Sequence, residues 1–114
     1  MDECIFCKIA SGEIPTEFLY KDDIVVVFKD LNPQAPVHFL VVPREHVTNV
    51  LDLPAEKGDI LLAIHKAIGE LADKQGIASS GFRIVVNTGE DGGQTVPHLH
   101  FHVLGGRFLD WPPG

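Results

Sequence analysis

The sequence predicts one α+β domain over residues 1–114, built as an antiparallel sheet with one long helix and a short N-terminal helix. Three observations lead to this prediction. Short β-rich runs are separated by turn-forming residues, one longer segment carries apolar residues at three- and four-residue steps, and the chain has 114 residues of which 45% are hydrophobic. A chain of that length can bury one core and is too short for two, so we expect the long helix to pack on a face of the sheet.

The stretch ECIFCKIASGEIP near the N-terminus predicts the short helix. Ile5, Phe6 and Ile9 are apolar at near-helical spacing, and Gly12 and Pro15 then favour a turn.

Four β-rich runs predict the strands of the sheet. IVVVF at 24–28 and HFLVV at 38–42 are separated by the turn-forming stretch DLNPQAP, so we expect them to be antiparallel neighbours. FRIVVN at 82–87 and HLHFHVL at 98–104 lie on either side of a glycine-rich loop at 89–97. The runs therefore come in two pairs, each with its own connecting loop.

Between the two pairs of strands, the pattern changes to that of a long helix. Asp52 is a suitable N-cap for it, and Gly76 is a suitable residue to end it. The apolar residues of the predicted helix recur at three- and four-residue steps, at Ile60, Leu61, Ile64, Ile68 and Leu71.

The charge and the hydropathy pattern exclude several classes of partner. A formal net charge of -7 argues against binding to polymeric nucleic acid, which depends on many contacts from Lys and Arg to phosphates. No apolar run reaches the roughly 18 to 20 residues of a membrane span, and the stretch MDECIFCKIA lacks the pattern of a secretory signal. We therefore expect a cytoplasmic protein without a membrane partner.

Three histidines alternate with apolar residues near the C-terminus. In a strand, His98, His100 and His102 would share one face, and the residues between them, Leu99, Phe101 and Val103, would face the core. Three imidazoles on one face suit metal binding or chemistry on phosphate. Phosphate chemistry is possible because a neutral imidazole is a nucleophile and a protonated one is a cation beside the anion.

The loop before the histidines favours phosphate over metal. Gly89, Gly92 and Gly93 allow the backbone to approach a ligand closely, and successive N–H groups can bind an anion. Thr95 adds a hydroxyl donor. The alternative interpretation of the glycines is an ordinary tight hairpin loop.

The stretches that carry these residues resemble the histidine triad (HIT) superfamily. His98-Leu-His100-Phe-His102-Val-Leu is similar to its His-x-His-x-His motif. The flanking stretches DLNPQAPVHFLVVP, VVNTGEDGGQTVPH and WPPG resemble the Hint-like branch of nucleotide-binding phosphoramidases. The resemblance implies a homodimer that hydrolyses the P–N bond of nucleoside 5′-phosphoramidates, such as adenylated amines, without a catalytic metal or other cofactor.

The resemblance also implies roles for individual residues. His100 would attack the α-phosphorus and form a nucleotidyl-histidine intermediate, while His102 and His38 would flank the phosphate and His98 would complete the catalytic group. The residues implied for binding a purine nucleotide are Asp30 and Leu31 at the ribose, Asn87, Gly93, Thr95 and Val96 at the phosphate, and Ile5, Phe6, Ile9, Ile14 and Phe28 at the base.

Cys4 and Cys7 form a CxxC motif, which is typical of a metal half-site or of a redox pair. A redox pair is expected after a strand in a βαβ unit, and this N-terminus has none. Zinc would need two more ligands, and His46 and His98 are available; some HIT proteins with this N-terminal pair have a similar Cys2His2 arrangement. The alternative is two free thiols.

Three other functions remain open at this stage. The first is a metal-dependent hydrolase or oxygenase in which two of the triad histidines bind the metal, and the second is a nucleotide-binding adaptor with incidental turnover. The third, within the superfamily, is a dinucleoside polyphosphate hydrolase. Trp111, in the terminal WPPG stretch, favours the phosphoramidase and suits docking onto a second subunit.

Overall fold

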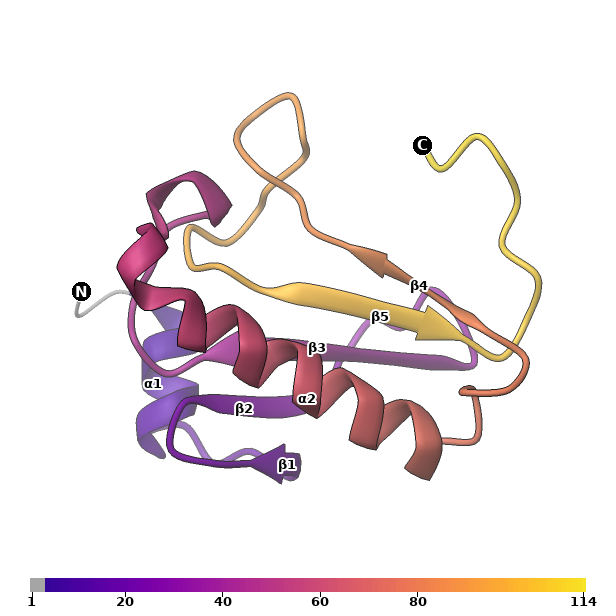
Figure 1. Cartoon of the computed structure of the whole chain (residues 1–114), viewed down its shortest axis with the longest axis horizontal. Coiled ribbons are helices and arrows are strands. Elements are labelled where there is room, and N and C mark those ends of the chain that lie inside the picture. Colours follow the sequence, from indigo (N-terminus) through magenta and orange to yellow (C-terminus); the bar gives the residue numbers. More distant parts are fainter. Residues whose placement is uncertain (1–3) are drawn as a thin grey trace.

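Five strands form one antiparallel sheet in the order β1-β2-β3-β5-β4, and two helices lie on its opposite faces (Figure 1). The computed structural model describes residues 4–114. This arrangement confirms the predicted α+β class with one long and one short helix. In chain order the elements are α1 (Ile5–Ser11), β1 (Phe18–Lys21), β2 (Val25–Lys29), β3 (Val37–Pro43), the 3₁₀ turns η1 (Val50–Asp52) and η2 (Ala55–Lys57), α2 (Gly58–Lys74), β4 (Phe82–Val85) and β5 (Phe101–Gly105).

The central strands β2 and β3 are buried on both faces, which explains why their sequences are continuous apolar runs. Val25, Val27, Phe39 and Val41 pack against α2 on one face. The residues between them pack against α1 on the other face, and these are Val26, Phe28, Leu40 and Val42. The alternation of a strand thus builds two cores from one run of residues.

Helix α1 is short, and both its ends are capped. Its N-cap is Cys4, whose Sγ accepts a hydrogen bond from the N–H of Cys7, and Gly12 ends it with a positive φ of 87°. These caps stabilise a helix of only seven residues and place Phe6 and Ile9 against the sheet.

The long helix begins later than the sequence predicts. α2 starts at Gly58, and the predicted N-cap Asp52 instead lies at the end of η1. The cause is Pro54, which disfavours helical backbone at the residue before it. The predicted end is confirmed, since Gly76 follows the helix with φ of 76° and its N–H donates to the Asp73 carbonyl.

Two strand predictions also needed correction. β1 was missed, because its four residues FLYK lack the β-branched pattern on which the prediction depended. β5 begins at Phe101 rather than at residue 98, because its pairing with β3 starts at Phe101 opposite Val41. The pairs β2–β3 and β4–β5 are antiparallel; β2 and β3 are joined by the predicted turn-forming stretch, and β4 and β5 by the predicted loop (Figure 1).

Among residues 4–114, no helix has both the length and the apolar character that crossing a membrane requires.

Replacing Gly69 and replacing Gly105 by alanine should have opposite effects on stability. A Cβ added to Gly69, inside α2, meets nothing within 4 Å, whereas one added to Gly105 comes within 3.0 Å of the Ile77 side chain. We expect Gly69→Ala to raise the free energy of unfolding by about 0.5–1 kcal/mol. Gly105→Ala should lower it by about 1–3 kcal/mol because it overpacks the core. Urea denaturation of both variants checks this, and equal effects would contradict the packing described here.

Candidate active site

A cavity of about 260 Å³ lies between α1 and the face of the sheet that α1 covers. Most of the residues predicted to bind the nucleotide line it. The lining residues are Ile5, Phe6, Ile9, Phe28, Lys29, Asp30, Leu31, Leu40, Thr95, Val96, His100 and His102. The cavity is therefore apolar on the side of α1 and carries the carboxylate and imidazoles on the side of the strands.

The sheet register brings histidines from two strands together. Leu40 of β3 pairs with His102 of β5, so His38, two residues before Leu40, lies on the same face as His102. The rings of His38 and His102 are joined by a contact of 3.0 Å from Nε2 to Nδ1. Positions 38 and 102 are far apart in sequence, and only strand pairing makes them neighbours.

A backbone carbonyl fixes the tautomer of His100. Nδ1 of His100 lies 2.8 Å from the carbonyl oxygen of His98 in a buried hydrogen bond. A carbonyl can only accept, so Nδ1 carries the proton and Nε2 carries the lone pair. His100 is only 5% exposed, and the edge contact of its ring with Phe6, at 5.1 Å between centroids, further restricts the ring.

The backbone likewise fixes the tautomers of His38 and His102. The N–H of Gln34 donates to Nδ1 of His38 at 3.0 Å, so the neutral ring of His38 carries its proton on Nε2. That Nε2–H donates to Nδ1 of His102, which leaves the proton of His102 on its own Nε2 as a donor. The chain of hydrogen bonds therefore ends in an N–H group on a residue that lines the cavity.

Asp30 lies beside this pair of histidines. One carboxylate oxygen of Asp30 is 3.4 Å from Nε2 of His38 and 3.9 Å from Nδ1 of His102, and the other accepts the N–H of Asn32 at 2.8 Å. Burial lowers the pKa of His38, and the charge of Asp30 opposes that effect only in part. Burial also lowers the pKa of His102, and the nearby rings of His100 and His38 lower it further. Both rings are therefore neutral at neutral pH.

Asp30, His38 and His102 have the composition of a three-ligand metal site, and their ligand atoms lie within 4.8 Å of one another. No sequence pattern indicates that a carboxylate lies beside these histidines. A metal on Nε2 of His38 would require Nδ1 to donate, as in most metal-bound histidines, but Nδ1 faces the donor N–H of Gln34. This hydrogen bond argues against the metal-dependent hydrolase considered from the sequence.

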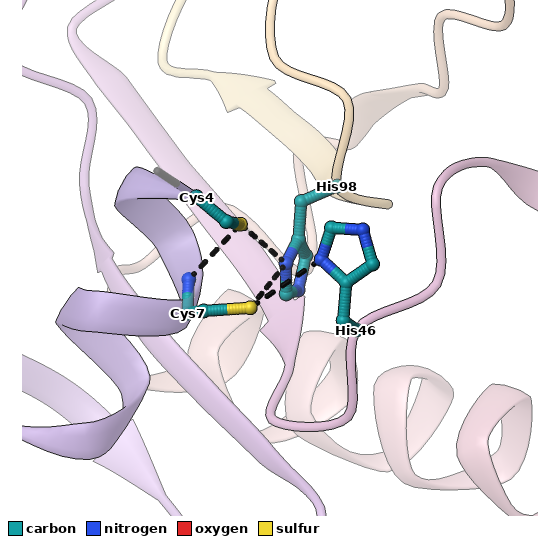
Figure 2. Close-up of side chains that lie close together, drawn as sticks. All are labelled: Cys4, Cys7, His46 and His98. Atoms are coloured by element: carbon teal, nitrogen blue, oxygen red, sulfur yellow. Dashed lines mark hydrogen bonds between the residues drawn. The ribbon is translucent and has the colours of Figure 1, made fainter. Parts of the chain in front are cut away.

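A second cluster unites the four predicted zinc ligands (Figure 2). Cys4 and Cys7 come from the N-terminal end of α1, His46 from the segment after β3, and His98 from the segment before β5, and their side chains point toward one another. Sγ of Cys4 is 3.2 Å from Nδ1 of His98, and Sγ of Cys7 is 3.3 Å from Nδ1 of His46 and 3.5 Å from Nδ1 of His98.

The donors of this cluster fit zinc. In tetrahedral zinc sites, a sulfur and a nitrogen on the same ion are about 3.5 Å apart, close to the separations above. Nε2 of His98 lies 2.8 Å from the Pro43 carbonyl and must donate to it, so Nδ1 offers its lone pair to the thiols. Burial raises the pKa of Cys7 to about 11, and the hydrogen bond and charge of Cys4 add to that effect. Two thiolates here are therefore costly unless a cation shares the site.

Two of the sequence expectations for His98 needed correction. The predicted strand does not reach His98, because β5 begins at Phe101, so strand alternation does not determine where its side chain points. Its ring is fully buried in the cluster with Cys4 and does not line the cavity. Its contact with the cavity is indirect, through the carbonyl that holds His100.

The structure does not bring every predicted residue to the cavity wall. Ile14 packs beside the core under α1, and Asn87 and Gly93 lie outside the lining.

The predicted loop is closed by hydrogen bonds of the Gln94 side chain, which the sequence interpretation missed. The side chain of Gln94 accepts from the N–H of Gly89 and donates to the carbonyls of Thr48 and Val96.

Sequence interpretation also missed Lys29 and Leu40 in the wall of the cavity. The strand period was the available signal, since Leu40 is two residues from His38 and must share its face. No comparable signal was available for Lys29, because the end of β2 is not marked in the sequence.

Comparison with known proteins agrees with this geometry. Residues 11–109 match the model of the HIT domain. The chain is 43% identical to the purine nucleoside phosphoramidase of Escherichia coli, over 95% of this chain and 91% of that protein.

Two solved structures are similar throughout. One is a HIT family hydrolase from Legionella pneumophila, with a TM-score of 0.95, 41% identity, and coverage of 98% of this chain and 100% of that chain. The other is a histidine triad protein from Clostridium difficile, with a TM-score of 0.92, 51% identity, and coverage of 96% and 95%. On the family match, the identity over nearly the whole length and the shared fold, this chain belongs to the HIT family.

Proposed function

We propose that the protein is a purine nucleoside phosphoramidase that hydrolyses the P–N bond of nucleoside 5′-phosphoramidates. The observation that carries the proposal is the hydrogen bond from Nδ1 of His100 to the His98 carbonyl, which leaves Nε2 as the nucleophilic nitrogen in the wall of a cavity with an apolar side. The 43% identity to the purine nucleoside phosphoramidase of E. coli supports the same activity.

In the proposed reaction, Nε2 of His100 attacks the α-phosphorus and a P–N bond forms to the imidazole. The bond from phosphorus to the amine breaks, and the amine takes a proton from solvent water as it leaves. Water then breaks the bond between phosphorus and His100, which releases the nucleoside monophosphate and restores the ring. The two displacements replace a single harder one.

The neighbouring groups have separate roles in this proposal. The Nε2–H of His102 donates to an anionic phosphate oxygen, and His38 holds His102 in the tautomer that makes this possible. Asp30, half-exposed at the edge of the cavity, accepts from the ribose hydroxyls. Phe6, Ile9 and other apolar residues from α1 and β2 surround the base.

We also propose that Cys4, Cys7, His46 and His98 bind a structural zinc ion. All four positions would be filled by protein, so the ion would tie α1 to the segments that carry His46 and His98. When bound, zinc would supply the positive charge that stabilises the two thiolates. No cofactor is needed for the chemical step.

A homodimer completes the proposal. β4 is an edge strand, and Phe82 and Ile84 on it are 37% and 46% exposed, while Trp111 is 81% exposed. Exposed apolar residues on a strand with one unpaired edge favour association with a second copy. Cys4 and Cys7 are not joined in a disulfide, which supports the reducing cytoplasm as the place of action.

Two other functions remain as candidates for this cavity. A dinucleoside polyphosphate hydrolase would use the same nucleophile, and an adaptor would use the same pocket without useful turnover. Incubation with adenosine phosphoramidate and diadenosine polyphosphate in parallel, with measurement of AMP release and AMP binding, separates the three. We expect faster release from the phosphoramidate.

The first prediction concerns His100. His100→Asn should abolish the covalent intermediate while AMP still binds, because the apolar side of the cavity and Asp30 remain. His102→Ala or His38→Ala should lower the rate by about 10²–10³ through loss of one contact to the phosphate or its support. Rapid quench with a radiolabelled phosphoramidate and mass mapping measures this. The control is His65→Asn, on the exposed face of α2, which should retain activity; label on another residue overturns the mechanism.

The second prediction concerns zinc. Protein purified without added metal should contain one equivalent of zinc, and Cys7→Ser should lose most of it. Chelation should lower stability, by about 2.7 kcal/mol if free zinc was present at a hundred times its Kd. Elemental analysis and thermal denaturation check both points. A zinc content near zero in the wild-type protein would mean that the thiols are free.

The third prediction concerns assembly. Analytical ultracentrifugation at micromolar concentration should give a dimer, and Ile84→Lys should give a folded monomer. Leu51→Lys replaces an 82% exposed residue on η1 and should remain a dimer. Deletion of residues 110–114 should change substrate preference more than stability. A wild-type monomer would refute the proposed dimer.

A further inference from the structure

The segment that carries His100 lies outside the sheet. β5 starts at Phe101, so residues 97–100 have no strand pairing that would fix their backbone. Their hydrogen bonds go elsewhere: the N–H of His98 donates to Val96 at 2.8 Å, and the N–H of Leu99 donates to Val47 at 2.6 Å. The position of the nucleophile therefore depends on contacts other than the sheet.

One peptide unit holds the ring of His100. The carbonyl of His98 and the N–H of Leu99 belong to the same planar group. The carbonyl accepts from Nδ1 of His100 at 2.8 Å, and the N–H donates to the carbonyl of Val47 at 2.6 Å. The orientation of this single plane thus sets the direction of the lone pair on Nε2 of His100.

The four side chains of Cys4, Cys7, His46 and His98, here called the Cys–His cluster, hold that peptide unit from both ends. On one side, the ring of His98 is held by Cys4 and Cys7 at Nδ1 and by the Pro43 carbonyl at Nε2. On the other side, the Val47 carbonyl belongs to the residue directly after His46. His46 is itself held by Cys7, and its ring packs on that of His98 at 4.9 Å between centroids.

We propose that Cys4, Cys7 and His46 are positioning residues for the nucleophile His100, an inference that rests on the proposed function. None of the three lines the cavity around His100 and His102. Their influence therefore passes through the peptide between His98 and Leu99. Besides stabilising the fold, the cluster keeps Nε2 of His100 oriented toward the phosphorus.

The effect should be on the chemical step. A reacting atom must be held in a near-attack geometry, and misplacement by about 1 Å can lower a rate by about a hundredfold. If the cluster is loosened, the ring of His100 can turn or exchange tautomers. Substrate binding depends on the apolar side of the cavity and on Asp30, so KM should change little.

Cys7→Ala is the sharpest test, because Cys7 contacts both histidines of the cluster and does not cap α1 with its side chain. We expect kcat for adenosine phosphoramidate to fall about 10- to 100-fold with KM nearly unchanged. The matched control is Ile64→Val, in the core under α2 on the other face of the sheet, which lowers stability without touching the cluster. His46→Gln gives the same test if Cys7→Ala does not fold.

A second readout does not depend on turnover. In protein with ¹⁵N-labelled histidine, the Nδ1–H of His100 should be visible and slow to exchange in the wild type and in Ile64→Val. In Cys7→Ala it should exchange quickly, and the ¹⁵N shifts should show both tautomers.

The outcomes separate the two proposals. A lower kcat together with a changed His100 spectrum in the cluster variants supports the inference. A wild-type kcat or spectrum in those variants, or an equal loss of kcat in Ile64→Val, overturns it and leaves the phosphoramidase proposal standing. Absence of turnover in the wild-type protein overturns the proposed function, whatever the spectra show.

Discussion

The hydrogen bond from Nδ1 of His100 to the carbonyl of His98 is the interaction on which the site depends. It fixes the ring, the tautomer and the direction of the remaining lone pair in a single contact. The same peptide is tied to Val47 through its N–H, so the groups that anchor it come from a segment more than fifty residues away. The reaction proposed for this chain therefore depends on the backbone geometry that orients His100, and not on an unusual side chain.

The backbone also distinguishes the two clusters of possible metal ligands. His98 donates to the carbonyl of Pro43 and so offers its other nitrogen to Cys4 and Cys7, which suits a metal. His38 accepts from the N–H of Gln34 and so must donate from its other nitrogen, which suits proton-bearing contacts to phosphate. One hydrogen bond in each cluster therefore suits the two groups of possible metal ligands to different chemistry.

The site occupies a boundary between regular and irregular structure. Strands β2 and β3 are buried on both faces, and α1 packs Phe6 and Ile9 against one of them so that the ring of Phe6 contacts His100. The nucleophile itself lies just before β5, where backbone hydrogen bonds to Val96 and Val47 and the buried ring of His98 hold the chain. A short helix of seven residues serves both the cavity and the Cys–His cluster, because Cys4 and Cys7 alternate with the residues that face the cavity.

The sequence by itself determined the α+β class, the pairing of β2 with β3, the alternation of the histidines and the CxxC pair of Cys4 and Cys7, because periodicity, turns and motif spacing are local properties. The resemblance to HIT proteins, and not local spacing, suggested His46 and His98 as their partners, and the structure brings the four side chains together. Tertiary structure alone decided that Asp30 joins His38 and His102, that His98 turns away from the cavity and that β5 starts only at Phe101. The physical reason is that these features depend on strand register and on which backbone groups remain free to hydrogen-bond. Both are set by contacts between segments far apart in the chain, and no local pattern encodes them.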